Sequence, residues 1–408
     1  MVPKRSTPRE NGLRSYRSVF VIKPARRFFA GSIPGRFGVA TVGLATIVFV
    51  QHVAHSYQLA GTAVGVLAVS NAFVAPVAAH IAARKGQAVV LRFSAVLMVI
   101  AAAALTTVVS HHSRAILLGS VALIGAAMPQ IGAIAVSRWS TLITTQAMRT
   151  ALAVESMMTE ITFLAGPAII SVAVSAWSPI VAPGISVGLI VFSALLLAAA
   201  HDSEPPRSSP GARSGSRLQH PALPVVLMAA ANIAIGSFFG ASQVSVIAAA
   251  TRLGNLDIAT AIYGVMSLTS LFAGLTYGAI QRTRAHAGWD LTASFLGLCV
   301  SAVWLTQTHA LPPLVLLLLV SGVFVAPTII TTSVITEHAT PPEHVNSTFT
   351  VLTSLQSLGS AVGSVSAGTL IDKYGAMHGF LVPGIATGVG AIVALTYALT
   401  RNRERDRL

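Results

Sequence analysis

The sequence predicts an all-α membrane protein whose twelve transmembrane helices form two six-helix halves. Twelve apolar stretches each reach the length of about 20 residues that a helix needs to cross a bilayer. Charged residues are 9% of the 408 residues, whereas a soluble domain has roughly 25%. With the N-terminus in the cytoplasm and sides alternating, all 26 Lys and Arg residues except Arg114, Arg252 and Lys373 fall on the cytoplasmic side. This is the positive-inside pattern of multi-pass membrane proteins.

The number of apolar stretches gives the number of predicted spans. A miscount by one span would scramble the charge alternation, so the charge pattern supports twelve as well. The predicted spans are 33–55, 60–82, 88–109, 114–137, 150–175, 179–200, 222–247, 258–280, 291–308, 312–335, 347–370 and 378–400.

Polar segments flank and divide these spans. Residues 1–32 form a basic N-terminal tail, followed by the first half at 33–200. The segment 201–221 is rich in Ser, Gly, Arg and Pro, which predicts a flexible cytoplasmic linker. The second half covers 222–400, and 401–408 form a second basic tail. Both termini are predicted to be cytoplasmic, in a protein of the cell membrane.

Composition and motifs also exclude several functions. The net charge of +14 lies in the predicted cytoplasmic loops, where it orients the chain and attracts anionic lipid, so we expect no nucleic-acid partner. The single Cys299 excludes a disulfide framework. Glu337–His338 and Glu343–His344 lack a third constrained ligand, so no metal is predicted. No Gly-x-x-x-x-Gly-Lys-Ser/Thr segment is present, hence no ATP site, and we expect no other cofactor.

Two mid-span prolines mark a faint repeat between the halves. Pro129 lies in the fourth span and Pro327 in the tenth, each about ten residues before a cytoplasmic loop. Helices interrupted at equivalent places in two halves point to the central site of a transporter.

Ionisable residues inside spans are costly and therefore functional candidates. Glu155 and Glu160 lie in the fifth span, where about 140° of helical rotation separates them. Glu160, near the midplane, is the main candidate for proton coupling. It could instead be a neutral carboxyl bonded between helices. Glu155 could couple protons or form a structural ion pair with Arg138 or Arg149. His52 titrates near neutral pH and could relay protons, or merely lie near the headgroups.

Neutral polar residues inside spans could line a substrate path. Each could equally bridge two helices by a hydrogen bond. These candidates are Gln51, Asn71, Gln130, Asn232, Gln243 and Gln356.

Together these features resemble the major facilitator superfamily over residues 33–400. After the second span, members carry Gly-x-Leu-x-Asp-Arg-x-Gly-Arg/Gln. Here Arg84, Gly86 and Gln87 match, whereas Ala79 and Ala83 replace the first Gly and the Asp. The resemblance implies that Arg84, with the turn at Gly86, gates the cytoplasmic side by holding the inward-closed state.

Two further segments resemble exporters of that superfamily. Gly166-Pro167 is similar to a motif of proton-coupled exporters, and implies a conformational role for both residues. The remaining matches resemble actinobacterial exporter-like members and imply a conformational role for Arg138. They comprise Met128-Pro129-Gln130-Ile131-Gly132, Arg138-Trp139, Glu155-Ser156 and Glu160.

The sequence thus predicts a secondary active transporter, acting as a monomer, that moves a small molecule by alternating access. Proton-coupled efflux is favoured, because of the Gly166-Pro167 resemblance. Three alternatives remain: import of a small metabolite, a transport-inactive sensor or partner protein with the same fold, and an intramembrane enzyme. The scarcity of charge in the spans favours a neutral or cationic amphipathic substrate over a polyanion.

Overall fold

The computed structural model describes residues 21–111, 113–143, 145–206, 223–279, 286–341 and 344–405, which form helices and no strand. Several predicted features lie outside these residues. They are the basic tail up to residue 20, the linker from residue 207 to 221, Glu343, and the last three residues.

The described residues of the first half form seven α-helices that make six spans. Two of them, α5 and α6, together form the fourth span. The helices are α2 (Lys23–Ala54), α3 (Tyr57–Lys85), α4 (Gln87–His111), α5 (Arg114–Ala127), α6 (Ile131–Leu142), α7 (Thr145–Ala176) and α8 (Ala182–Ala199). Short 3-10 turns η1 (Pro179–Val181) and η2 (His201–Ser203) flank α8.

The described residues of the second half form six long helices. They are α9 (Leu223–Arg252), α10 (Ala259–Ala279), α11 (Ala287–Leu305), α12 (Leu311–Ala339), α13 (Val345–Tyr374) and α14 (Leu381–Arg405). The 3-10 turns η3 (Leu256–Ile258) and η6 (Ala376–Phe380) precede α10 and α14.

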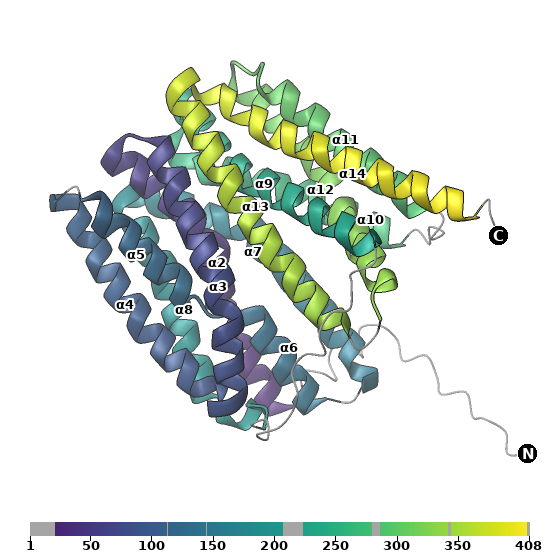
Figure 1. Ribbon diagram of the computed structural model, residues 1–408. Coiled ribbons are helices and arrows are strands. Elements are labelled where there is room, and N and C mark those ends of the chain that lie inside the picture. Colours follow the sequence, from purple (N-terminus) through teal and green to yellow (C-terminus); the bar gives the residue numbers. More distant parts are fainter. Residues whose placement is uncertain are drawn as a thin grey trace, which may run out of the picture.

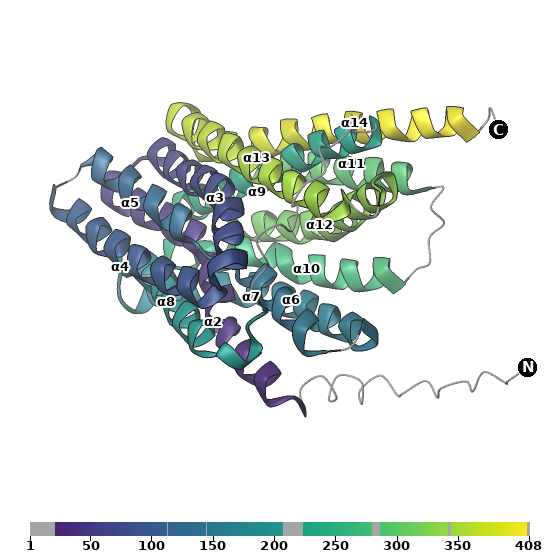
Figure 2. The same ribbon diagram turned by 60° about the horizontal axis from the view of Figure 1, so that its bottom comes forward.

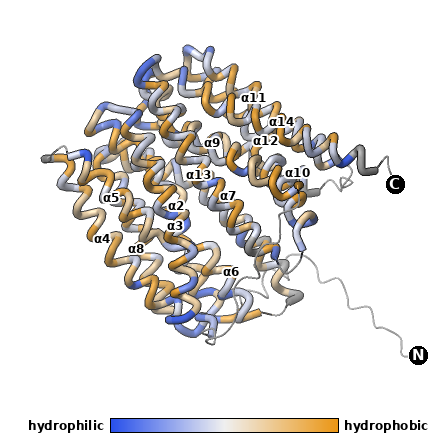
Figure 3. The backbone as a smooth tube through the Cα atoms, viewed as in Figure 1, coloured by the Kyte–Doolittle hydropathy of each residue, from blue (hydrophilic) through white to orange (hydrophobic). Residues whose placement is uncertain are grey.

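Length and hydropathy identify eleven spans among the described residues, and α13 is not one of them. It is nevertheless 30 residues long and lies within the bundle, packed along α9 and α3 (Figure 1). Its low hydropathy comes from Ser, Thr and Gly, which suit a helix that contacts protein on several sides. The other helices are apolar along most of their length, and hydrophilic residues gather toward helix ends (Figure 3). The predicted all-α architecture of two six-helix halves is confirmed.

The two halves meet at one end of the bundle and diverge toward the other. We call the end where α2 begins and α14 ends the termini side, and the opposite end the far side. Figures 1 and 2 show the halves spreading apart toward the termini side. The main contacts between halves join α3 to α13 and α7 to α10.

Glycines allow the close helix approaches that the bundle requires. An added Cβ at Gly236 of α9 would lie 1.9 Å from the carbonyl oxygen of Gln356 in α13. At Gly61 of α3 it would lie 2.1 Å from the carbonyl oxygen of Ser364, also in α13. Small residues at helix interfaces let backbones approach in this way in membrane proteins. The long helix α13 is therefore packed tightly against a neighbour in each half.

The two mid-span prolines behave differently. The helix of the fourth span is interrupted at Met128-Pro129-Gln130, between α5 and α6. By contrast, α12 continues through Pro327 as one helix. The hydroxyl of Thr328 donates to the carbonyl oxygen of Phe324, at 2.7 Å, in the turn around this proline. The predicted repeat is thus a helix break in the first half only.

Candidate functional site

A cavity of about 390 Å³ lies between the halves, on the termini side of the contacts that join them at the far side. Most of its wall belongs to the first half, from α2, α3, the α5–α6 break and α7. The second half contributes Gln243 of α9 and Ser360 of α13. Its polar lining contains Arg36, Asn71, Gln130, Thr159, Thr162, Gln243 and Ser360. This wall offers one cation, several amides and several hydroxyls among apolar side chains.

A buried ion pair lies in the α2–α7 wall of this cavity. The guanidinium of Arg36 donates to the carboxylate of Glu155, and both side chains are 8% exposed. The indole N–H of Trp139 donates to the other carboxylate oxygen, at 2.7 Å. The Arg36 Nε donates to the hydroxyl of Ser32, at 3.3 Å. Glu155 therefore does not pair with Arg138, and the Arg149 side chain is outside the described part of the structure. Arg36 itself reaches the cavity.

The break between α5 and α6 forms another part of the wall. Asn71 of α3 donates through Nδ2 to the carbonyl oxygens of Gly125, at 3.2 Å, and Met128, at 3.3 Å. Its Oδ1 accepts from Nε2 of Gln130, at 3.1 Å. A broken helix leaves carbonyls without intrahelical donors, and in a membrane these must be satisfied within the protein. Asn71 thus hydrogen-bonds to the carbonyls at the helix break and also lines the cavity. It combines the two roles that the sequence left open, bridging helices and lining a substrate path.

Glu160 lies on a different face of α7 from Glu155. It is half-buried, on the stripe that continues through Leu164 and Pro167. That stripe meets α10, because an added Cβ at Gly264 would lie 3.1 Å from the Cβ of Pro167. Glu160 is about two turns closer to the termini side than Pro167. Among the described residues, none forms a hydrogen bond or ion pair with its carboxylate.

The far-side end of the cavity is closed by contacts between halves. An added Cβ at Gly43 of α2 would lie 3.2 Å from Oε1 of Gln243. At Gly166 of α7 it would lie 2.9 Å from a methyl carbon of Thr41, which shows how closely α7 packs on α2. The hydroxyl of Thr260 donates to the carbonyl oxygen of Pro167, at 2.8 Å, and so joins α10 to α7. Gly166 and Pro167 therefore lie where α7 contacts both α2 and the second half.

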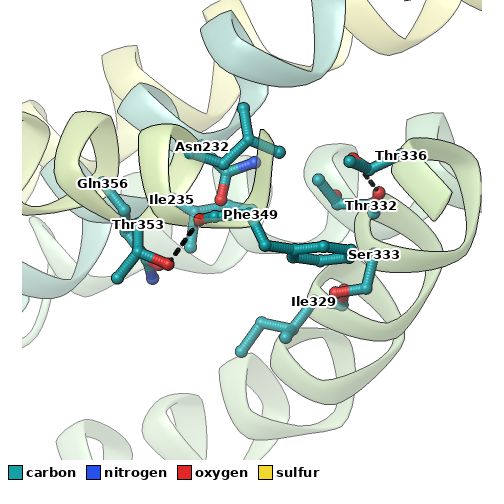
Figure 4. A pocket seen from close by; sticks show the side chains of 10 residues that line it. Asn232, Ile235, Ile329, Thr332, Ser333, Thr336, Phe349, Thr353 and Gln356 are labelled. Carbon is teal, nitrogen blue, oxygen red and sulfur yellow. Dashed lines mark hydrogen bonds between the residues drawn. The ribbon is translucent and has the colours of Figure 1, made fainter. Parts of the chain in front are cut away.

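A smaller cavity of about 110 Å³ lies within the second half, between α9, α12 and α13. Asn232 and Gln356, both predicted to line a substrate path, are in its wall. The ring of Phe349 reaches across it from α13 toward Ser333 of α12 (Figure 4). Asn232 donates to the carbonyl oxygen of Met228 in its own helix, at 2.8 Å. This cavity adds hydroxyls and amides but no charged group.

Three of the residues predicted to have a gating or conformational role, Arg84, Gly86 and Arg138, lie at the termini side. Arg84 is exposed in the last turn of α3. Gly86 ends that helix with φ +99°, a conformation that favours glycine. Arg138 is fully buried and donates to Gln87 Oε1, at 3.0 Å, and to the carbonyl oxygens of Leu197, at 2.9 Å, and Ala200, at 3.1 Å. It thus fastens the end of α8 to the α3–α4 turn.

The start of the predicted linker is folded against the first half. Ser203 in η2 accepts from Arg138 Nη1, at 2.8 Å. Glu204 Oε1 accepts from the backbone N–H of Ala88 at the start of α4, at 3.2 Å. Residues 201–204 therefore belong structurally to the first half.

Two candidates lie away from both cavities. His52 is exposed and Gln51 half-buried in the last turn of α2, at the far side. Gly43 marks the far-side wall of the large cavity. At 1.5 Å per residue, Gln51 lies about 12 Å beyond it along the helix.

The main residue that sequence reasoning missed is Arg36, with Trp139 as its indirect partner. The charge pattern places Arg36 among the cytoplasmic charges, because it is only the fourth residue of the first predicted span. The signal was present, since an Arg inside a span is expected to have a polar partner. The partner could not be read from the sequence, because Glu155 is 119 residues away.

Comparisons with known proteins agree with the overall fold. Residues 256–408 match the model of the Major Facilitator Superfamily. No curated protein matches the sequence. The nucleoside transporter NupG is similar in structure, with a TM-score of 0.69 and 14% identity, over 92% of this chain and 98% of that one. An auto-inhibited POT family peptide transporter gives a TM-score of 0.70 and 11% identity, over 94% and 97% of the two chains.

A bacterial homologue of the iron transporter ferroportin, in the inward-facing state, gives a TM-score of 0.70. It shares 12% identity with this chain, and the match covers 92% of this chain and 98% of that one. At such identities the likeness concerns the fold. The protein therefore has the major facilitator fold, as the sequence predicted.

Proposed function

We propose that the protein is a secondary active transporter that moves a small molecule across the cell membrane by alternating access. The observation that carries this proposal is the cavity between two six-helix halves, with polar groups in its wall, at the end where the halves spread apart (Figures 1 and 2). A cavity of about 390 Å³ is within the size range of small-molecule sites. The wall combines amides, hydroxyls and apolar surface, which suits a compact amphipathic substrate.

The orientation in this proposal follows from charge. Lys and Arg concentrate at the termini side, so this side is cytoplasmic, and the described conformation opens to the cytoplasm. A reporter fused after Leu408 should then be active only as a cytoplasmic reporter. Activity of an external reporter at that position would reverse the orientation.

Proton coupling rests on two carboxylates with different surroundings. Glu155 is held by Arg36 and Trp139 inside the wall. Glu160 faces the seam between α7 and α10, where the halves move relative to one another during alternating access. A carboxylate that alternates between a helix–helix interface and an aqueous cavity can bind a proton in one conformation and release it in the other. Glu160 is therefore the proposed coupling residue, with Glu155 as the second candidate.

Export is the proposed direction, supported by the Gly166-Pro167 resemblance. A growth screen tests the proposal. Cells that overexpress the protein, the Glu160→Gln variant or the control Glu337→Gln are compared on a panel of toxic amphipathic compounds. Glu337 is exposed at the termini-side end of α12. The protein and the control should confer tolerance to at least one compound, and Glu160→Gln should not, at equal membrane levels.

A transport-inactive sensor of the same fold is the second candidate, favoured by Ala83 in place of the expected Asp. Uptake into membrane vesicles separates the two. Saturable movement of any compound from the panel supports a transporter, and its direction under a proton gradient separates efflux from import. Absence of saturable movement across the panel would favour the sensor.

A further inference from the structure

The far side of the bundle carries a carboxylate contact between the two halves. Asp372, near the end of α13, accepts three hydrogen bonds from the first turn of α3. The backbone N–H of Tyr57 donates to Oδ1, at 2.9 Å, and that of Gln58 to Oδ2, at 2.9 Å. The hydroxyl of Ser56, which is also the N-cap of α3, donates to Oδ2, at 2.7 Å. Asp372 thus caps a helix of the opposite half.

Position and charge favour this contact. The first amides of a helix have no intrahelical acceptor and carry partial positive charge, so a carboxylate is stabilised there. Hydrogen bonds from such amides to a charged carboxylate are stronger than those to a neutral acceptor. Because α3 and α13 belong to different halves, each of the three bonds must break when the halves separate at the far side.

Next to Asp372 the backbones of α3 and α13 lie close together, which holds Asp372 at the start of α3. An added Cβ at Gly368 would lie 2.1 Å from the carbonyl oxygen of Tyr57. One turn further in, the hydroxyl of Ser364 donates to the carbonyl oxygen of Gly61, at 3.0 Å. The far-side halves of α3 and α13 therefore form a continuous seam that ends in the Asp372 cap.

When the termini side closes, the other ends of α3 and α13 should come to lie side by side there. The two helices run antiparallel, so the last turn of α3 is then opposite the first turn of α13. Both helices end at a glycine in a similar conformation, Gly375 with φ +101° and Gly86 with φ +99°. Asp372 lies three residues before Gly375, and the residue three before Gly86 is Ala83. The alanine side chain has no acceptor atom, so position 83 does not supply the corresponding carboxylate.

We propose that Asp372 acts as a latch that holds the far side closed, and that Ala83 leaves the termini side without a corresponding latch. This asymmetry biases the protein toward the conformation that is open at the termini side. The bias belongs to the chain itself and exists without substrate. It explains why the far side is closed in the structure. It also makes opening of the far side, which must break the Asp372 bonds, the costly step of the cycle.

Distances between spin labels test the latch in lipid nanodiscs without any substrate. The background is Cys299→Ala, with labels on introduced cysteines at exposed positions. A far-side pair is placed at Ala115 and Ala310, and a termini-side pair at Thr141 and His338. The unsubstituted background should show mainly short far-side and long termini-side distances.

Asp372→Ala should raise the far-side-open population by about tenfold, since a factor of ten corresponds to about 1.4 kcal/mol, within the range for loss of a helix cap. Ser56→Ala, which removes one of the three bonds, should give a smaller shift in the same direction. The matched control is Lys373→Ala, because Lys373 is exposed and its ammonium lies over the Tyr374 ring, 5.1 Å from its centroid. It should leave both distance distributions unchanged.

Ala83→Asp tests the second half of the proposal. It supplies the missing carboxylate opposite the first turn of α13, so the termini-side-closed population should rise by a similar factor. Unchanged far-side distances in a folded, monodisperse Asp372→Ala protein would overturn the latch, as would an equal shift in Lys373→Ala. Unchanged distances in Ala83→Asp would overturn the asymmetry. Because no substrate is used, these outcomes are independent of whether the protein transports.

Discussion

The guanidinium of Arg36 and the carboxylate of Glu155 form a buried ion pair that joins α2 to α7 in the wall of the central cavity. Both groups belong to the first half, so the pair need not break when the halves move. Only the Arg36 side of the pair contributes to the cavity wall. The pair therefore supports the cavity and places a positive group at its edge.

Breaking this pair should destabilise the protein. Removing one partner of a buried pair costs about 3–5 kcal/mol, because the remaining charge is left uncompensated. Glu155→Gln keeps an oxygen for the Trp139 indole but strands the Arg36 charge. Arg36→Met strands the carboxylate. Each single variant should unfold at a markedly lower temperature in detergent, whereas the double variant should recover much of the loss.

That comparison also identifies the role of Glu155. If the double variant is no more stable than the singles, the pair does not stabilise the fold in the way proposed. If Glu155→Gln leaves stability unchanged but stops gradient-driven transport, Glu155 replaces Glu160 as the coupling group.

Asn71 should be needed to hold the helix break between α5 and α6. Asn71→Ala leaves the carbonyl oxygens of Gly125 and Met128 without this donor, at a cost of roughly 1–3 kcal/mol. The matched control is Asn232→Ala, since the one acceptor of Asn232 among the described residues is a carbonyl of its own helix. Thermal unfolding of both variants in the same detergent measures the difference. Equal unfolding temperatures would contradict the role assigned to Asn71.

Gly236→Ala should separate α9 from α13. The new Cβ would lie 1.9 Å from the carbonyl oxygen of Gln356, so the backbones must move, and overpacking of this kind costs about 1–3 kcal/mol. Gly188→Ala on α8 is the control, because nothing lies within 4 Å of its added Cβ. The first variant should unfold at a lower temperature and the second should not. A tolerated Gly236→Ala would mean that the α9–α13 approach is adjustable.

Arg84→Ala should lower turnover and leave substrate affinity within about tenfold, or 1.4 kcal/mol. In the described conformation, where the termini side is open, Arg84 is exposed and has no hydrogen-bond or ion-pair partner among the described residues. Any gating role must therefore act in the opposite conformation. Turnover and half-saturation in reconstituted vesicles check this, with the adjacent Lys85→Ala as control. Normal turnover would refute the gate, and a change in affinity alone would place Arg84 in the substrate path.

Sequence reasoning predicted the fold more fully than the site, for physical reasons. Bilayer thickness and charge asymmetry act along the chain, so span number and alternation can be read from it. This worked even for α13, whose low hydropathy reflects its packing against α9 and α3. The partners of a buried side chain come from distant segments instead. The Arg36–Glu155 pair illustrates this, since charge patterning places Arg36 on the cytoplasmic side, and the sequence offers Glu155 either proton coupling or an ion pair with Arg138 or Arg149.

The interrupted helices show the same limit. Pro129 and Pro327 are equivalent in sequence, yet only the first lies in a break. At Pro129 the amide of Asn71, from another helix, is available to the freed carbonyls. Around Pro327, α12 continues, with Thr328 and Thr332 bonded back to its own carbonyls. No local pattern distinguishes the two, because the deciding residue of the first half lies more than 50 positions away.

Accumulation in proteoliposomes tests the central claim most directly. The purified protein is reconstituted, and a compound identified by the growth screen is supplied at equal concentration on both sides with an imposed proton gradient. The protein should concentrate the compound against its gradient while protons move the other way. Glu160→Gln should lose this accumulation but keep exchange at zero gradient, and Glu337→Gln should behave as the unsubstituted protein. Gradient-driven accumulation that is unchanged in Glu160→Gln, or absent in the unsubstituted protein, would contradict the account.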